Sequence, residues 1–223
     1  MYKKQQIKSK ERIRNHGEVF TAEREVKAMC DLVKDETNRI DSRFLEPACG
    51  DGNFLAEILT RKLAIVRKKY AKSHLDYEKN AVLAASSIYG VDILQDNVLA
   101  CRERIFGIWD KEYTSVCKRD SNNETRAAVK YIFSRNIVCG NALTLKCVDE
   151  NGNDTDYPIV FSEWAFITGS QLQRCDYTFA DLLAQDDKKQ KTKQESMFDA
   201  QPSDEGKFLK RYISHYRKVQ ENG

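Results

Sequence analysis

The chain has 223 residues, with 37 Lys and Arg against 34 Asp and Glu, so its small net charge says little about its partners. This length suits one substantial α/β domain with appendages. No apolar run approaches the roughly 20 residues of a membrane span, and the N-terminus carries no hydrophobic signal region. These observations argue against a membrane protein and predict a cytoplasmic one.

Cysteine and histidine spacing points away from metal and disulfide chemistry. The seven cysteines include no C-x-x-C pair and have no histidine close by. This pattern fits neither a zinc site nor a small disulfide framework, so we expect reduced thiols. His16, His74 and His215 are scattered, and we expect no bound metal.

Basic residues gather in three runs, "MYKKQQIKSKERIRNH", "RKLAIVRKKY" and "KFLKRYISHYRKVQ". Lys and Arg interleaved with aromatic residues are typical of surfaces that bind a nucleic-acid backbone. For any one run taken alone, a solvated charged surface is the simpler explanation. Together the runs make a nucleic-acid backbone a reasonable partner.

Short strands alternate with helices over the first two thirds of the chain. Thr21 is a candidate N-cap for the first helix. Apolar spacing predicts helices over residues 26–33, 54–66, 76–87 and 94–109, and strands that end at Leu45, Asp92 and Cys139. This alternation indicates a doubly wound, mostly parallel α/β sheet with helices on both faces.

The remainder of the chain departs from this alternation. Asn151-Gly152 is a hairpin-turn signal between two apolar arms, so we expect a β-hairpin inserted after the third strand. The apolar run Ile159 to Phe161 predicts a buried fourth strand whose end carries an acid and two aromatic residues, Glu163, Trp164 and Phe166. Residues 185–206 lack apolar periodicity and predict a flexible linker, and residues 207–223 predict a basic amphipathic helix.

We therefore expect four regions. Residues 1–35 form a basic leader with the first helix, and residues 36–184 form the α/β domain. The linker over 185–206 and the basic helix over 207–223 follow.

The loop after the first strand, "FLEPACGDGNF", is the most informative stretch. Gly50 and Gly52 allow positive φ and a close approach of the backbone to a ligand. Ligands of doubly wound sheets bind beyond the carboxyl ends of the strands, where this loop lies. The spacing is neither G-x-G-x-x-G nor a phosphate loop. Because Glu46 and Asp51 would repel a pyrophosphate, they favour a positively charged ligand such as a sulfonium with an amino acid tail.

Two further polar residues follow strand ends. Asp92 ends the second strand, where a carboxylate can accept both ribose hydroxyls of a nucleoside. The alternative is that Asp92 only caps the next helix, and the two roles are compatible. Asn141 follows the third strand, and its amide is a candidate to reach an adenine edge; an Asn after Gly is otherwise a turn residue.

These motifs, taken in order, resemble those of the adenine-specific (N6) DNA methyltransferases of restriction-modification systems. "HGEVFTAEREVKAMCDLV" resembles the N-terminal motif of that family, and "FLEPACGDGNFL" resembles its S-adenosylmethionine loop. "IYGVDI" and "GNAL" resemble the strand ends that hold the ribose and the adenine. The resemblance covers roughly residues 14 to 145 and implies a Rossmann-like fold that binds S-adenosyl-L-methionine.

The resemblance also implies a role for each matching residue. Phe20 and Thr21 would flank the methionine part of the cofactor, Asp92 would hold the ribose, Ile93 would pack on the adenine and Asn141 would reach its edge. The residues that would line the loop around the sulfonium and the amino acid tail are Glu46, Ala48, Gly50 and Asp51. Ala22 stands where the family usually has proline.

The catalytic motif of the family, [DNS]-P-P-[YFW], is absent from the sequence. By position, "SEWAF" is the only candidate replacement. Adenine methyltransferases flip the target base out of the duplex and stack it on an aromatic ring while accepting hydrogen bonds from its amino group. Trp164 or Phe166 is a candidate to stack the base and Glu163 to accept the hydrogen bond, but no residue replaces the carbonyl that proline positions.

Three functions therefore remain open. The first is a DNA adenine methyltransferase, or a modification subunit that works with a partner subunit supplying target recognition. The second is a degenerate protein that binds cofactor and DNA without methyl transfer. The third is a methyltransferase for RNA or a small molecule.

Overall fold

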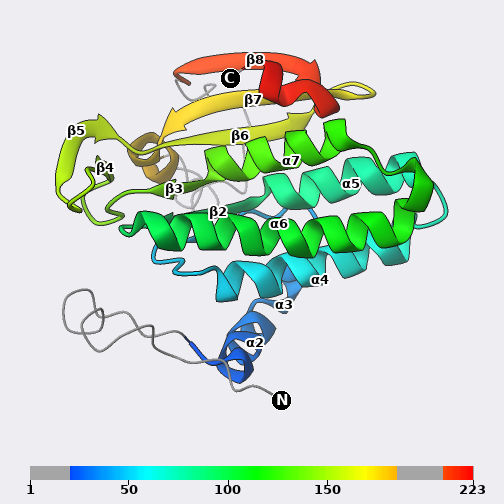
Figure 1. Ribbon diagram of the computed structural model, residues 1–223, viewed down its shortest axis with the longest axis horizontal. Coiled ribbons are helices and arrows are strands. Elements are labelled where there is room, and N and C mark those ends of the chain that lie inside the picture. The colour runs from blue at the N-terminus through cyan, green and yellow to red at the C-terminus, as the bar shows by residue number, and fades with distance from the viewer. Residues whose placement is uncertain (1–20, 185–207, 223) are drawn as a thin grey trace, which may run out of the picture.

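Three short parallel strands form the sheet around which the protein is arranged. The structure is a computed structural model that describes residues 21–184 and 208–222 (Figure 1). β1 (Phe44–Glu46), β2 (Ile88–Asp92) and β3 (Ile137–Cys139) pair in parallel in the order β1-β2-β3. The three expected strands are confirmed, and the chain is of the mixed α/β class.

Helices precede and connect these strands, as the apolar spacing predicts. Ser73 and Asn122 cap two of them by accepting hydrogen bonds from backbone N–H groups three residues on. Ala22, not Thr21, is the N-cap of the first helix, so the expected Thr21 cap is wrong by one residue. The helices are α2 (Glu23–Leu32), α3 (Lys34–Thr37), α4 (Asn53–Tyr70), α5 (His74–Ser86), α6 (Gln95–Cys117), η1 (Lys118–Asp120) and α7 (Asn123–Asn136).

The two faces of the parallel sheet are covered differently. In β2, Ile88 belongs to the main core, which it shares with α4 to α7. Tyr89 and Val91 join a second, smaller cluster with Ile159 and Phe161. Within the described residues, long helices thus cover one face, and antiparallel strands with a helical turn at 179–184 cover the other. The expected doubly wound arrangement is not seen there, because the chain after β3 folds back as strands.

The inserted β-hairpin is confirmed. β4 (Lys146–Val148) and β5 (Asp154–Pro158) pair antiparallel. Gly152 has a φ of 81°, which the tight turn between them requires. Figure 1 shows the hairpin projecting from the same end of the molecule at which β3 ends.

A second, antiparallel sheet follows in the order β6-β7-β8, formed by β6 (Val160–Phe166), β7 (Gln171–Thr178) and β8 (Lys210–His215). The expected fourth strand is present as β6, but Glu163 and Trp164, which were expected at its end, lie within it. β6 continues through Phe166 and pairs antiparallel with β7. Side chains of a strand alternate between its two faces. Here Ser162 and Trp164 are buried while Glu163 between them is partly exposed, so the strand continues through these residues.

The expected basic helix over 207–223 is also wrong. This segment forms β8 and a 3₁₀ segment, η2 (Tyr216–Asn222). Pairing with β7 satisfies the backbone of β8, and Tyr216 and Val219 are buried in the main core, where η2 packs beside α7. The expected linker and the leader before Thr21 lie outside the described residues. None of the helices within 21–184 and 208–222 combines the length and hydropathy that crossing a bilayer requires.

A buried lysine holds the amino ends of β1 and β2. Lys62 of α4 is fully buried, and its Nζ donates to the carbonyl oxygens of Ile40 and Ser42 and to Ser87 Oγ. These acceptors use all three ammonium donors. Burial lowers the pKa of Lys62 to about 7.

A buried carboxylate ties the C-terminal segment to the helices. Glu78 of α5 accepts hydrogen bonds from the hydroxyls of Tyr113 and Tyr216, from Asn122 Nδ2 at 3.1 Å and from Arg217 Nε at 2.7 Å. Burial and the bond to Glu78 raise the pKa values of both tyrosines. The segment after β8 is thus held by ionic as well as apolar contacts.

We expect Glu78→Ala to lower the free energy of unfolding by about 3 kcal/mol, because Arg217 and two tyrosine hydroxyls lose their buried acceptor. Urea unfolding followed by circular dichroism measures this loss. Glu103→Ala, at an exposed position of α6, is the control and should change stability by less than about 0.5 kcal/mol. Equal midpoints for the two variants would contradict the role of Glu78.

Candidate functional site

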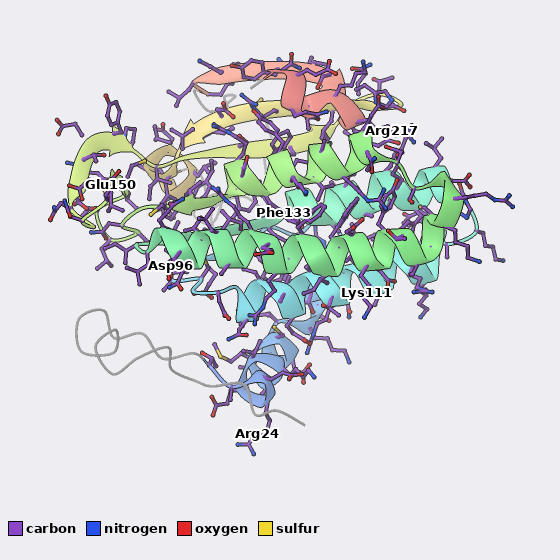
Figure 2. The ribbon with its side chains drawn as sticks, viewed as in Figure 1. Arg24, Asp96, Lys111, Phe133, Glu150 and Arg217 are labelled. Carbon is purple, nitrogen blue, oxygen red and sulfur yellow. The ribbon has the colours of Figure 1, made fainter. Side chains whose placement is uncertain are left out.

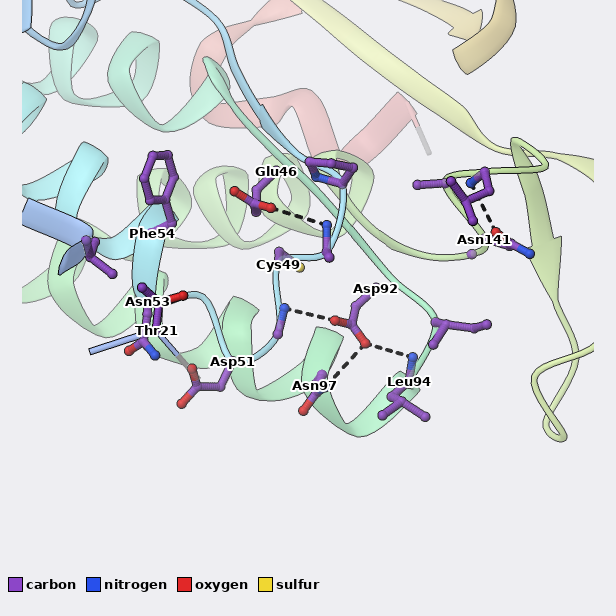
Figure 3. Close-up of a pocket in the computed structure, with 18 of the residues that line it drawn as sticks. Thr21, Glu46, Cys49, Asp51, Asn53, Phe54, Asp92, Leu94, Asn97 and Asn141 are labelled. Carbon is purple, nitrogen blue, oxygen red and sulfur yellow. Dashed lines mark hydrogen bonds between the residues drawn. The ribbon is translucent and has the colours of Figure 1, made fainter. Parts of the chain in front are cut away.

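A cavity of about 620 Å³ opens at the carboxyl ends of the parallel strands. The segments after β1, β2 and β3 line it (Figure 3). Thr21, Val26 and Met29, in and just before α2, complete the lining. Its volume lies in the usual range for small-molecule and cofactor sites. The position agrees with the rule that ligands of α/β sheets bind beyond the carboxyl strand ends.

The glycine loop forms one wall of the cavity. Gly50 has a φ of 51° and Gly52 a φ of 85°, so the expected positive φ angles are confirmed. A Cβ at Gly52 would lie 2.6 Å from Cys101 Sγ of α6. The loop can pass this close to α6 only because position 52 has no side chain.

Asp92 fixes the geometry of this loop. Its Oδ2 accepts a hydrogen bond from the backbone N–H of Gly50 at 2.8 Å, and its Oδ1 accepts from the N–H of Leu94 at 2.9 Å and from Asn97 Nδ2 at 3.2 Å (Figure 3). Asp92 therefore does bond the turn before α6, as the alternative interpretation held, and it also lines the cavity. Ionised carboxylate oxygens each accept more than one hydrogen bond, so capacity for a ligand hydroxyl remains.

One face of α6 packs against the glycine loop and supports it. Asn97, Cys101 and Arg104 recur at helical spacing on a single face. Arg104 Nη1 donates to Asn53 Oδ1 at 2.7 Å, to the carbonyl oxygen of Asp51 at 3.1 Å and to Asp51 Oδ1 at 3.0 Å. The sequence analysis did not select these three residues for the site. Their spacing shows that they share one face of a helix, but it does not show that this face meets the glycine loop.

Glu46 and Asp51 contribute acidic groups with different surroundings. Burial raises the pKa of Glu46, whose Oε1 accepts a hydrogen bond from the N–H of Ala48 at 3.4 Å. Asp51 instead forms an ion pair with Arg104. Of these two acids, Glu46 when ionised can thus attract a cationic ligand group more directly.

Asn141 lines the cavity at the start of the hairpin insertion. Its Nδ2 donates to Asp154 Oδ1 at 3.1 Å, and its Oδ1 accepts from the N–H of Leu143 at 3.0 Å. The amide is therefore part of the turn that positions the hairpin. A contact with an adenine edge would require it to share or exchange these bonds.

The expected cofactor residues converge on this one cavity. Those that line it are Thr21, Glu46, Ala48, Gly50, Asp51, Asp92, Ile93 and Asn141, and Phe20 lies outside the described residues. The sequence analysis did not select the apolar lining, which includes Val26, Met29, Phe54, Leu94 and Leu143. Chain regions 21–29, 46–54, 92–97 and 140–143 thus meet around one site.

The expected catalytic residues do not line this cavity. Trp164 is buried, and its Nε1 donates to Asn136 Oδ1 at 3.0 Å. Phe166 packs edge-on against Tyr216. Glu163 forms an ion pair with Arg43 and lines a separate cavity of about 120 Å³. The expectation that these residues lie beside the cofactor site is wrong. Glu163 and Trp164 lie within β6, Phe166 ends it, and β6 belongs to the antiparallel sheet.

The described part of the chain contains no candidate metal site. No group of three or more His, Cys, Asp and Glu side chains there is placed to hold a metal ion. The seven cysteines are free thiols. Cys49 and Cys101 lie together under the glycine loop, where their hydrogen bond and burial raise the pKa of the Cys49 thiol.

Comparison with known proteins does not assign the chain to a family. No protein-family model, curated protein or solved structure matches the chain. A functional assignment therefore depends on the residues of the cavity.

We expect Gly52→Ala to destabilise the protein by about 2 kcal/mol, because the new Cβ both meets Cys101 and strains a positive φ. Gly107→Ala is the matched control: a Cβ there meets nothing within 4 Å, and alanine should raise helix stability by about 0.5–1 kcal/mol. Urea unfolding of both variants measures the difference. A Gly52→Ala protein as stable as the wild type would refute the close approach of the loop to α6.

Proposed function

We propose that the cavity binds S-adenosyl-L-methionine and that the chain is the cofactor-binding part of a DNA adenine (N6) methyltransferase with a Rossmann-like domain. The observation that carries this proposal is the convergence on one cavity of eight of the nine residues selected from the sequence for cofactor binding. These residues come from the ends of three adjacent parallel strands and from the N-terminal helix region. When bound, the cofactor would supply an activated methyl group.

The cavity residues fit the parts of such a cofactor. Glu46 is the acid assigned to the positively charged end, because Asp51 is already paired with Arg104. The glycine loop lets backbone groups approach the amino acid tail. Asp92 is assigned to the ribose hydroxyls and the apolar side chain of Ile93 to the adenine ring.

Methyl transfer to DNA requires groups that hold the target base, and we do not assign these to Glu163, Trp164 and Phe166. The side chain of Trp164 has its hydrogen-bond donor engaged by Asn136, and Glu163 is engaged by Arg43. We therefore propose that the acceptor groups for the base come from a partner subunit. These same contacts favour a second candidate, a protein that binds cofactor and DNA without transferring the methyl group.

Incubation of the purified chain with methyl-labelled S-adenosylmethionine, duplex DNA and RNA separates the candidates. Label in DNA adenine supports a methyltransferase that acts alone. Cofactor binding without label in either nucleic acid supports a subunit or a non-catalytic binding protein, and label in RNA alone would overturn both DNA proposals.

We expect Asp92→Ala to weaken S-adenosylmethionine binding by at least about 100-fold, because it removes both the ribose acceptor and the bond that holds Gly50. Glu163→Ala should bind the cofactor as the wild type does, since Glu163 lies outside the cavity. Isothermal titration calorimetry measures both affinities, with circular dichroism to verify folding. Unchanged affinity in a folded Asp92→Ala protein would sink the cofactor proposal.

A further inference from the structure

Two basic segments that are remote in sequence lie side by side at the end of the molecule opposite the cavity. The loop between α4 and α5 meets η1, where His74 Nδ1 lies 2.5 Å from Asp120 Oδ2. Figure 1 shows the ends of α4 and α6 at the same end of the ribbon. We call the exposed basic side chains gathered here the helix-end patch: Lys68, Lys69, Lys72, Lys118 and Arg119.

The charge of the helix-end patch is not neutralised locally. None of its five cations takes part in an ion pair with any residue in the described ranges, 21–184 and 208–222. Of the neighbouring acids, Glu112 pairs with Arg67 at 2.9 Å, and Asp120 contacts His74, which offsets its charge only when the imidazole is protonated. The exposed Asp76 and Glu124, in the first turns of α5 and α7, offset only part of the excess. The surface therefore keeps a local positive charge, although the net charge of the whole chain is small.

The backbone at Lys118 gives a second, independent observation. This residue has a φ of 49° and a ψ of −120°, a conformation that strongly favours glycine. Lysine at this position strains the turn after α6. Strained non-glycine residues are typical of functional positions.

We propose that the helix-end patch binds the sugar-phosphate backbone of nucleic acid without reading its sequence, as an anchor separate from the cavity. Several unpaired Lys and Arg side chains on one exposed surface are what phosphate contacts require. α4 runs from the cavity at Phe54 to the patch at Tyr70, and its 18 residues span about 27 Å. A backbone held at the patch thus leaves the cavity free.

The surroundings favour nucleic acid over a membrane surface. Binding to a bilayer by a basic helix needs an exposed apolar face that enters the lipid. The apolar side chains near the end of α4, Leu63 and Val66, are 0–2% exposed because they face the core. Leu75 is the exposed large apolar side chain beside the patch, which is too little for insertion.

Fluorescence anisotropy with a labelled 20-base-pair duplex tests the proposal in the full chain. The triple variant Lys68→Gln, Lys69→Gln, Lys72→Gln should bind about tenfold more weakly, and the slope of log affinity against log salt should become shallower by about 2 to 3. The matched control, Lys34→Gln, Lys130→Gln, Lys210→Gln, removes the same charge from exposed sites elsewhere and should change the slope by less than about 1. Equal losses of duplex affinity in the two triple variants would overturn the proposal that the helix-end patch binds nucleic acid.

A single substitution separates a binding role from a structural one. Lys118→Gly relieves the backbone strain, so the melting temperature should rise while duplex affinity falls about threefold. A rise in melting temperature with unchanged affinity would contradict the assignment of Lys118. Stronger binding of the wild type to phosphatidylserine vesicles than to duplex or RNA would overturn the choice of partner. Failure to bind S-adenosylmethionine would refute the proposed function but leave this test intact.

Discussion

The geometry of the candidate site depends on the carboxylate of Asp92. This one group bonds the N–H of Gly50 in the loop after β1, the N–H of Leu94 before α6 and the amide of Asn97 within α6. The loop after β1 and the start of α6, which must be close together for a cavity to exist, are thus joined at the end of β2. Because the same group also lines the cavity, a ligand that bonds Asp92 would be held at the point where the loop itself is positioned.

The sheet is held at its other end by a buried lysine. Lys62 of α4 bonds the segment before β1 and the residue before β2, so one polar side chain fixes each end of this strand pair, Lys62 at the amino end and Asp92 at the carboxyl end. Such groups are stable in the interior only when their hydrogen-bonding capacity is used. The short strands are therefore placed by buried polar contacts as well as by ladder hydrogen bonds and apolar packing.

The antiparallel half of the protein has a different role from the parallel half. An acid followed by aromatic residues in β6 resembled an active-site rim, yet each side chain there has a structural contact. Glu163 pairs with Arg43, Trp164 bonds Asn136 and Phe166 packs against Tyr216. The bond of Trp164 attaches β6 to α7, and the bonds of Glu78 to Tyr216 and Arg217 attach the C-terminal segment to α5 (Figure 2). The ion pair of Glu163 reaches Arg43, before β1.

The sequence by itself determined the parallel strands, most helices, the inserted hairpin and the glycine and polar residues at the strand ends that line the cavity. These features follow from local patterns: apolar periodicity, glycines that need positive φ, and polar residues placed directly after strands. Only the tertiary structure decided the direction of β6, the strand at Lys210–His215 and the support of the loop by Arg104. A short segment with alternating or amphipathic residues fits both a strand and a helix, and its partner, which lies far away in sequence, decides between them.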